Sequence, residues 1–249
     1  AVAYVYAGDL YFDFAGYSLF AVAISYLMGV ETPMNFNKPF VSKNIKEFWN
    51  RWHMTLSFWV RDYIFTPLNA SLRSWGKTGI YVSLLVTFVA IGVWHGAGWT
   101  FALYGLFQGI LVIYETLFKK QRQQLQDRVG ATAWKTLMII RTYVFFALSL
   151  LFFRVSQIGD VFYAYRHMFD GFATGIKELR LGMDDHYWIV FALAVIIMLI
   201  TEHVNSRRNL IAWTEQQRAI VRWPVYFAVV FVIFLYGAFG VDNFIYVQF

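Results

Sequence analysis

Two short segments of this 249-residue sequence combine imidazole groups with hydroxyl, amide and indole side chains. The first contains His53, with Asn50 before it and Ser57 after it. The second, Ile91–Thr100, contains His95 among several glycines. Because neutral imidazole is the commonest proton acceptor near pH 7, either histidine could serve as a general base.

The first segment, Glu47–Tyr63, is expected to form one amphipathic helix that ends near Pro67. The residues of its apolar stripe are Trp49, Trp52, Leu56, Trp59 and Tyr63, and those of its polar stripe are Asn50, His53, Ser57 and Arg61. A helix lying in the membrane interface would explain these stripes without any chemistry. The His53–Ser57 spacing alone is a weak signal for nucleophilic catalysis, because it fixes no acid that would orient the imidazole.

The second segment lies between two long apolar runs that are nearly free of charge. An ionisable group such as His95 is costly at membrane depth and therefore indicates a function. Gly92, Gly96 and Gly98 allow the backbone to turn, or another group to approach closely. The alternative is a structural histidine whose ring is satisfied by a backbone carbonyl in a short extracytoplasmic turn.

The composition defines the kind of element that must position these segments. Hydrophobic residues make up 59% of the chain, aromatic residues 21% and charged residues 14%. A soluble fold of this length could not bury so much apolar surface, and a disordered chain would be far more polar. The absence of cysteine excludes disulfides and a thiolate nucleophile, and the scattered histidines predict no metal site.

Six segments are apolar and long enough to cross a bilayer, which takes about 20 residues. They are Leu10–Val30, Gly79–Trp94, Trp99–Phe118, Thr136–Phe153, Tyr187–Thr201 and Pro224–Gly240. Basic residues are concentrated in three alternate loops, which are Glu31–Thr78, Lys119–Lys135 and Glu202–Trp223. The positive-inside rule places these loops in the cytoplasm. It also explains the net charge of +6 without a nucleic-acid partner. We expect an all-α integral membrane protein, a multi-span helical bundle with re-entrant or interfacial helices, and a single domain over residues 1–249.

Four motifs follow one another along the chain. They are Phe12–Ser18 (FDFAGYS), Asn35–Phe40 (NFNKPF), Phe48–Ser57 (FWNRWHMTLS) followed by Arg61–Tyr63 (RDY), and Trp94–Trp99 (WHGAGW). Together they resemble the membrane-bound O-acyltransferase (MBOAT) family, and the final residues 244–249 (FIYVQF) resemble the end of its bacterial polysaccharide-modifying members. Members of that family usually carry several more helices before the first motif. We therefore expect this chain to be the C-terminal portion of a longer protein.

The resemblance implies the transfer of an acyl group to a hydroxyl, inside a central funnel between helices. His95 matches the catalytic histidine of the family and His53 its second histidine. The resemblance also implies substrate-binding positions at Asn50, Arg51, Ser57, Trp94, Trp99 and Asp13. The donor would be an acyl thioester, either acetyl-CoA or a phosphopantetheinyl carrier protein, and no bound cofactor or metal is expected.

The resemblance points to two branches of the family. The early motifs are similar to the D-alanyl transfer protein of teichoic acid modification, and the later ones to alginate and peptidoglycan O-acetyltransferases. Acetyl transfer to an extracytoplasmic polysaccharide is the first expectation and D-alanyl transfer the second.

Both branches imply a multi-pass protein of the bacterial inner (cytoplasmic) membrane. The implied partners are an extracytoplasmic transferase of the SGNH-hydrolase type, an acyl carrier protein and membrane lipid. Two other classes stay open from the residues alone. One is a transporter with Arg141, Asp13 and His95 along its path, and the other is a non-catalytic scaffold subunit.

Overall fold

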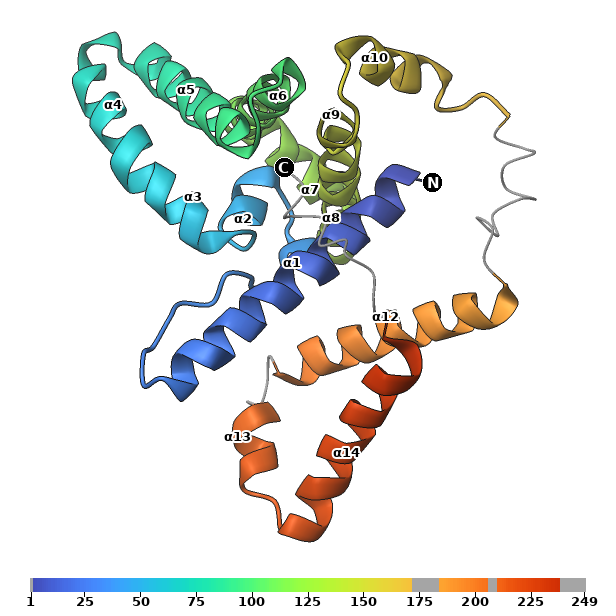
Figure 1. Ribbon diagram of the computed structural model, residues 1–249. Coiled ribbons are helices and arrows are strands. Elements are labelled where there is room, and N and C mark those ends of the chain that lie inside the picture. Colours follow the sequence, from blue (N-terminus) through green and yellow to red (C-terminus); the bar gives the residue numbers. More distant parts are fainter. Residues whose placement is uncertain (1, 172–183, 206–209, 238–249) are drawn as a thin grey trace. The chain divides into compact units, whose positions relative to one another are not determined.

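The computed structural model describes residues 2–171, 184–205 and 210–237 (Figure 1). These residues form helices joined by turns and loops, and no strand occurs among them, which confirms the expected all-α class. The chain divides into two compact units, one reaching to Asp170 and the other covering Gly171–Asn243. The second unit contains α12 (Asp185–Asn205), α13 (Leu210–Glu215) and α14 (Ala219–Tyr236).

Six helical stretches are long and apolar enough to cross a membrane. They are Tyr6–Leu27 within α1 (Val2–Leu27), Lys77–His95 (α5), Trp99–Leu117 (α6), Ala131–Arg154 (α8, Ala131–Ser149, with α9, Leu151–Arg154), Trp188–Asn205 within α12, and Ala219–Tyr236 (α14). Each expected span has its counterpart, although the bounds differ by several residues, and the chain is a multi-pass membrane protein. The expected sixth span began at Pro224, but this proline lies inside α14. The expected end of that span, Gly240, lies outside the described residues.

Helices α5 and α6 form an antiparallel hairpin in which glycines let the two backbones touch. A Cβ atom added to Gly92 would lie 2.1 Å from the carbonyl oxygen of Phe101. One added to Gly105 would lie 2.1 Å from the carbonyl oxygen of Phe88. Small residues permit this close approach in membrane helices. The packing of the hairpin therefore fixes the position of its turn, where α5 ends at His95.

The residues between α1 and α5 enter the helical bundle instead of forming a surface loop. They form a 3-10 turn (Pro39–Val41), α2 (Ile45–Trp49), α3 (Met54–Val60), a π-helical turn (Arg61–Phe65), α4 (Thr66–Ser71) and a second 3-10 turn (Arg73–Trp75). The ring of Phe48 in α2 lies 4.3 Å from that of Phe146 in α8, measured between ring centroids. The ring of Trp52 lies 4.9 Å from the same phenylalanine. Residues 35–53 thus pack against the spanning helices, and we call them the re-entrant segment.

A buried chain of hydrogen bonds holds this segment in place. The indole N–H of Trp49 donates to Oε1 of Gln108 in α6, at 3.2 Å. The amide Nε2 of Gln108 in turn donates to Oγ of Ser149 in α8, at 2.7 Å. Gln108 and Ser149 are fully buried. Because a buried polar group is costly unless it is paired, this chain fixes α2 against both spanning helices.

The expectation of one amphipathic helix over residues 47–63 is wrong. Helix α2 ends at Trp49, and His53 adopts a left-handed backbone conformation with φ of 45°. Two backbone hydrogen bonds replace the helical ones. The Asn37 N–H donates to the Arg51 carbonyl and the Met54 N–H to the Asn35 carbonyl, both at 2.9 Å. The apolar stripe is accordingly divided, since Trp49 and Trp52 are buried whereas Trp59 and Tyr63 are exposed.

The expected helix end near Pro67 is also wrong, because α4 continues to Ser71. The backbone N–H of Thr66 bonds to the carbonyl of Arg61, five residues back, and this wider turn leads into Pro67 at the start of α4. A proline is tolerated in the first turn of a helix because its missing N–H is not needed there. The π-helical turn, α4 and the second 3-10 turn contact α5. Near the start of α5, a Cβ on Gly79 would lie 2.3 Å from the Leu72 carbonyl oxygen.

Candidate functional site

His53 is the last residue of the re-entrant segment and immediately precedes α3. The residue is only 9% exposed. The ring of Phe14 in α1 meets the imidazole edge-on, with centroids 4.6 Å apart. Trp94 in α5 lies on another side, at 6.0 Å. The imidazole is therefore held between two spanning helices that lie on either side of it in the sequence.

Asn35 determines which nitrogen of His53 carries the proton. Its Oδ1 lies 3.1 Å from Nδ1 of His53. The same oxygen accepts the backbone N–H of Thr55 at 3.3 Å, and Nδ2 of Asn35 donates to Ser18 at 3.1 Å. A backbone N–H can only donate, so the atom facing it must be the amide oxygen. Nδ1 of His53 therefore donates to Asn35, and Nε2 keeps its lone pair.

That lone pair is buried and available. Nε2 of His53 has no hydrogen-bond partner in the described part of the chain. Burial, together with the nearby imidazole of His95, lowers the pKa of His53 to about 3. His53 is thus neutral at physiological pH, with a bare nitrogen that can accept a hydrogen bond.

His95 is the last residue of α5 and is half-buried at the turn of the α5–α6 hairpin. Three aromatic rings lie beside its imidazole. The ring of Trp94 lies 4.8 Å away, that of Phe153 at 5.0 Å and that of Tyr104 at 6.4 Å. Trp94 contacts both histidines, so the structure brings His53 and His95 to one place although 42 residue positions separate them in the numbering.

Three other predicted site residues are at least partly buried, and two of them already have hydrogen-bond partners. Asp13 adjoins Phe14 in α1, is half-buried, and has an Oδ2 atom that is buried without a hydrogen-bond partner. Arg51 forms an ion pair with Glu47 at 3.0 Å. The hydroxyl of Ser57 donates to the Trp52 carbonyl at 3.2 Å.

Three further predicted residues are exposed. Asn50 is exposed at the end of α2, and Trp99, at the start of α6, is 78% exposed. Trp94 is 57% exposed although it contacts both histidines. The structure therefore groups Trp94 with His53 and His95, whereas the side chains of Asn50 and Trp99 are exposed.

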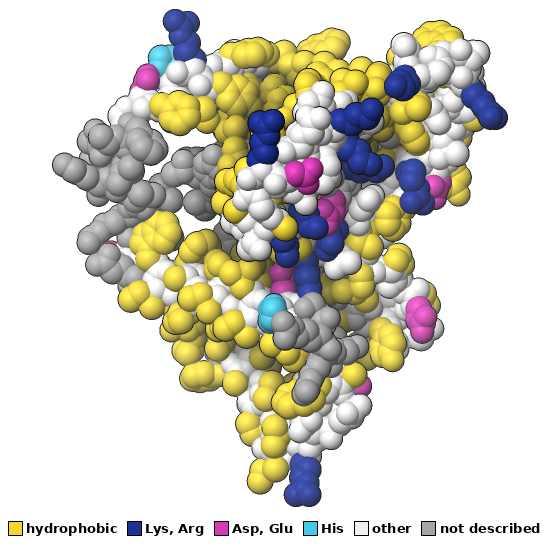
Figure 2. All heavy atoms as spheres, turned by 180° about the vertical axis from the view of Figure 1, so that it is seen from behind, with side chains coloured by type: hydrophobic (Ala, Val, Ile, Leu, Met, Phe, Trp, Pro, Cys, Tyr) yellow, Lys and Arg dark blue, Asp and Glu magenta, His cyan; other side chains and the backbone are white. Residues whose placement is uncertain are grey.

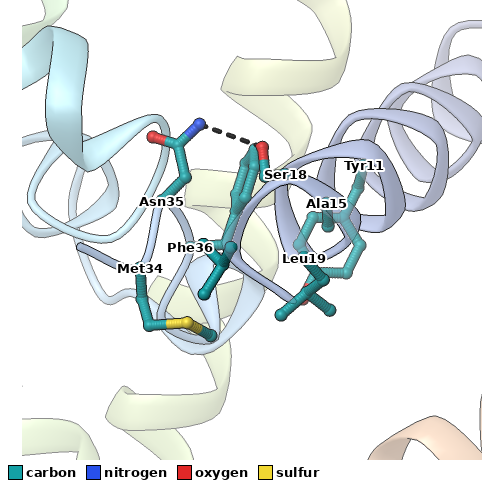
Figure 3. Close-up of a pocket in the computed structure, with 8 residues that line it drawn as sticks. Tyr11, Ala15, Ser18, Leu19, Met34, Asn35 and Phe36 are labelled. Carbon is teal, nitrogen blue, oxygen red and sulfur yellow. Dashed lines mark hydrogen bonds between the residues drawn. The ribbon is translucent and has the colours of Figure 1, made fainter. Parts of the chain in front are cut away.

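The sequence reasoning missed Asn35 as a site residue. Its only signal was its position at the head of the NFNKPF motif, because nothing in the spacing connects it to His53. A small pocket of about 80 Å³ adjoins Asn35 between α1 and the loop of Met34 and Phe36 (Figure 3). Neither histidine lines this pocket. No group of His, Asp or Glu suited to a metal ion occurs among the described residues.

Comparison with known proteins finds a family match over the part of the sequence that contains this site. The model of the membrane-bound O-acyltransferase family matches residues 2–157, which include both histidines. The teichoic acid D-alanyltransferase of Streptococcus thermophilus is 44% identical over 167 residues, covering 61% of this chain and 40% of that protein.

Two O-acetyl transfer proteins are also similar. The peptidoglycan O-acetyltransferase of Helicobacter pylori is 35% identical over 153 residues, covering 61% of this chain and 28% of that protein. The probable alginate O-acetylase of Pseudomonas aeruginosa is 32% identical over 178 residues, covering 72% of this chain and 32% of that protein. The chain thus spans well under half the length of the relatives that it matches.

Proposed function

Because the chain belongs to the membrane-bound O-acyltransferase family, we propose that the whole protein moves an acyl group from a cytoplasmic thioester donor toward hydroxyls of an extracytoplasmic polysaccharide. His95 is the catalytic base of this reaction. The observation that carries the proposal is the meeting of two imidazoles at Trp94, one from a spanning helix and one from the re-entrant segment. Residues 1–249 act as one membrane-embedded domain in this proposal.

His95 removes the proton from an acceptor hydroxyl while the hydroxyl oxygen attacks the thioester carbonyl. A carbon–oxygen bond forms, and the negative charge passes to the carbonyl oxygen. When this intermediate collapses, the carbon–sulfur bond breaks and the thiolate leaves with the proton that His95 had taken. The acceptor hydroxyl belongs to the polysaccharide itself or to a relay group on a partner protein.

His53 is proposed to hold the substrate through its bare Nε2. This nitrogen can accept a hydrogen bond from a substrate O–H or N–H group. The Asn35 contact fixes the ring so that Nε2 points away from Asn35.

The remaining motif residues are proposed as substrate contacts. Trp94 offers an apolar wall beside both histidines, and Asp13 offers an unpaired carboxylate oxygen next to Phe14. Asn50 and Trp99 have exposed side chains, whereas Arg51 and Ser57 must give up existing contacts to reach a ligand. No cofactor is bound in this proposal, since the thioester donor is itself a substrate.

The acyl group is proposed to be acetyl, with acetyl-CoA as donor, by analogy with the O-acetyl transfer relatives. D-alanyl transfer from a phosphopantetheinyl carrier protein to teichoic acid is the second candidate. Its support is the higher identity to the D-alanyltransferases, 44% against 32–35% for the O-acetyl transfer proteins. Either route would lie in the bacterial inner membrane and would pass the acyl group to an extracytoplasmic transferase of the SGNH-hydrolase type.

The test is acyl transfer by the full-length protein, supplied with its acceptor, using labelled acetyl-CoA and, separately, a labelled D-alanyl carrier protein. We expect His95→Ala to reduce transfer at least about 100-fold, as the loss of a general base does. His53→Ala should reduce it less. His203→Ala, at the exposed end of α12, is the matched control and should leave transfer unchanged.

Each outcome of this test has one meaning. Transfer at the wild-type rate by both His95→Ala and His53→Ala would refute the assignment of the site. Solute flux without any acyl transfer would favour a transporter. The donor that labels the acceptor faster decides between acetyl and D-alanyl transfer.

A further inference from the structure

A second pocket, which is strongly basic, lies in the first unit beside α7 and the start of α8. Its volume is about 380 Å³. The residues that line it are Lys43, Asn44, Lys119, Arg122, Gln123, Gln126, Ala131, Trp134, Lys135 and Met138. They come from the re-entrant segment, from α7 (Lys119–Val129) and from the start of α8. Four of them are cationic and none is acidic, and Figure 2 shows Lys and Arg side chains gathered on this side of the molecule.

The charges beneath the pocket do not balance. The carboxylate of Glu115, at the end of α6, pairs with Arg122 at 2.8 Å and also with Arg141 of α8. Two guanidinium groups thus share one carboxylate whose side chain is only 4% exposed. Nη1 of Arg122 and Nε of Arg141 are buried without a hydrogen-bond partner in the described structure. A buried excess of positive charge is costly unless an anion compensates it.

The start of α8 adds to the positive electrostatic potential of the pocket. Gly130 precedes this 19-residue helix, and no side chain caps its first N–H groups. Ala131, the first helical residue, lines the pocket. Unpaired N–H groups and the helix dipole favour an anion at such a position. The helix end therefore supports what the lysines and arginines already indicate.

The position of the pocket indicates the source of the anion. The spanning part of α6 ends at Leu117, and that of α8 begins at Ala131, so the pocket lies where the spans meet water. Trp134 lines it, and tryptophan is favoured at the level of lipid headgroups. The flanking loop Lys119–Lys135 is one of those that the positive-inside rule assigns to the cytoplasm, where the leaflet carries anionic lipid.

We propose that this pocket binds the phosphate of an anionic membrane lipid. The lysines and Arg122 hold the phosphate oxygens, and the α8 N–H groups complete the site. The lipid is a structural ligand and not a reactant. Nineteen residue positions along α8 and α9 separate Trp134 from Phe153, which contacts His95, and at 1.5 Å per residue this is about 28 Å.

The test uses the full chain in detergent and in nanodiscs. Native mass spectrometry counts the phosphatidylglycerol molecules that the protein retains, with phosphatidylcholine as the neutral comparison, and equilibrium dialysis measures the binding of inorganic pyrophosphate. The variant is Lys43→Gln/Lys119→Gln/Lys135→Gln, which leaves Arg122 and its partner Glu115 intact. The matched control Lys38→Gln/Lys46→Gln/Lys77→Gln removes the same charge outside the pocket.

We expect the wild type and the control to retain phosphatidylglycerol in preference to phosphatidylcholine. The pocket variant should bind phosphatidylglycerol at least about 10-fold more weakly, in line with the attraction that each lysine contributes near an anionic surface. A thermal unfolding curve checks that the variant is folded. Equal retention by all three proteins would overturn the proposal. Binding of pyrophosphate without retention of phosphatidylglycerol would also overturn it, and would assign the pocket to a soluble phosphate compound.

Discussion

The two histidines reach the same place by opposite structural means. His53 lies on an irregular stretch of backbone, in a left-handed conformation, and the hydrogen bond that its Nδ1 donates to Asn35 fixes its ring. His95 ends a regular helix, and the glycine-mediated contact of α5 with α6 sets its position. A polar contact fixes the first imidazole, and close backbone packing fixes the helix that carries the second.

The two regions should therefore fail in different ways. A larger side chain at the α5–α6 contact moves a whole helix, because the backbone atoms that it meets cannot rotate away. A change of polarity beside His53 leaves the helices in place but changes the protonation and aim of one ring. Substitutions that touch no histidine can separate these two effects.

Gly92→Ala should have the largest effect on stability. The added Cβ would lie 2.1 Å from the Phe101 carbonyl oxygen, which is part of the backbone and cannot rotate away. We expect a loss of about 3 kcal/mol, at the upper end of the range for overpacking, and a loss of transfer activity as the hairpin opens. The measurement is unfolding in detergent mixtures, followed by circular dichroism.

Two matched glycines control this prediction. A Cβ on Gly16, in the spanning helix α1, would meet nothing within 4 Å, so Gly16→Ala should not destabilise the protein. A Cβ on Gly96 would meet only the side chain of Phe101, and Gly96→Ala should cost less than Gly92→Ala because that ring can move. If all three variants were equally stable, backbone contact would not be what positions His95.

Asn35→Ala should have the second largest effect. It removes the acceptor shared by His53 and Thr55 and leaves the buried Nδ1–H of His53 without a partner, at a cost of about 2 kcal/mol. Asn37→Ala, two residues away in the same loop, changes an exposed side chain and is the control.

Asn35→Asp distinguishes a positioning role from a structural one. The carboxylate keeps an acceptor oxygen beside His53 and adds a negative charge, which raises the pKa of the imidazole. We expect this variant to shift the pH profile of acyl transfer toward higher pH. An unchanged profile in Asn35→Asp, together with full activity in Asn35→Ala, would contradict the positioning role.

The most gradual effect should be the dependence of stability on pH. In the unfolded chain His53 takes up a proton below about pH 6.5, whereas the folded protein resists protonation until pH falls to about 3. The unfolded state therefore binds more protons within this window, so the stabilisation is complete above pH 6.5 and is lost as the pH falls. The slope is at most about 1.4 kcal/mol per pH unit.

His53→Gln isolates this contribution, because glutamine does not titrate. Detergent-induced unfolding measured from pH 7.5 to pH 4.5 should show a shallower loss of stability for His53→Gln than for the wild type. Parallel curves for the two proteins would mean that His53 is not held neutral by its surroundings.

The sequence predicted the spanning helices well because they depend on composition alone. A run such as Trp99–Leu117 must be helical in lipid, since every backbone group has to be paired within the segment. The sequence also singled out both histidines, one by its depth and the other by its motif, and the structure brings both to Trp94, while their roles stay predictions. The close approach at Gly92 followed from the special steric freedom of glycine.

The re-entrant segment could not be predicted in the same way. The spacing of Trp49, Trp52 and Trp59 has the period of a helix, but long-range contacts interrupt that helix. Trp49 donates a hydrogen bond to Gln108, and His53 donates one to Asn35. Neither partner lies within the same helical stretch. Local periodicity carries no information about such partners. The wide turn before Pro67 likewise lies where the chain contacts α5, a helix later in the sequence.

The buried Trp49–Gln108–Ser149 chain has a consequence for how the protein is made. Gln108 and Ser149 belong to helices that follow the re-entrant segment in the sequence, so a ribosome releases residues 35–53 well before their final partners exist. The segment therefore lacks its full set of buried partners until α8 has been made. A chain cut short before α8 would carry both histidines but not the contacts with Ser149 and Phe146 that hold the re-entrant segment in the bundle.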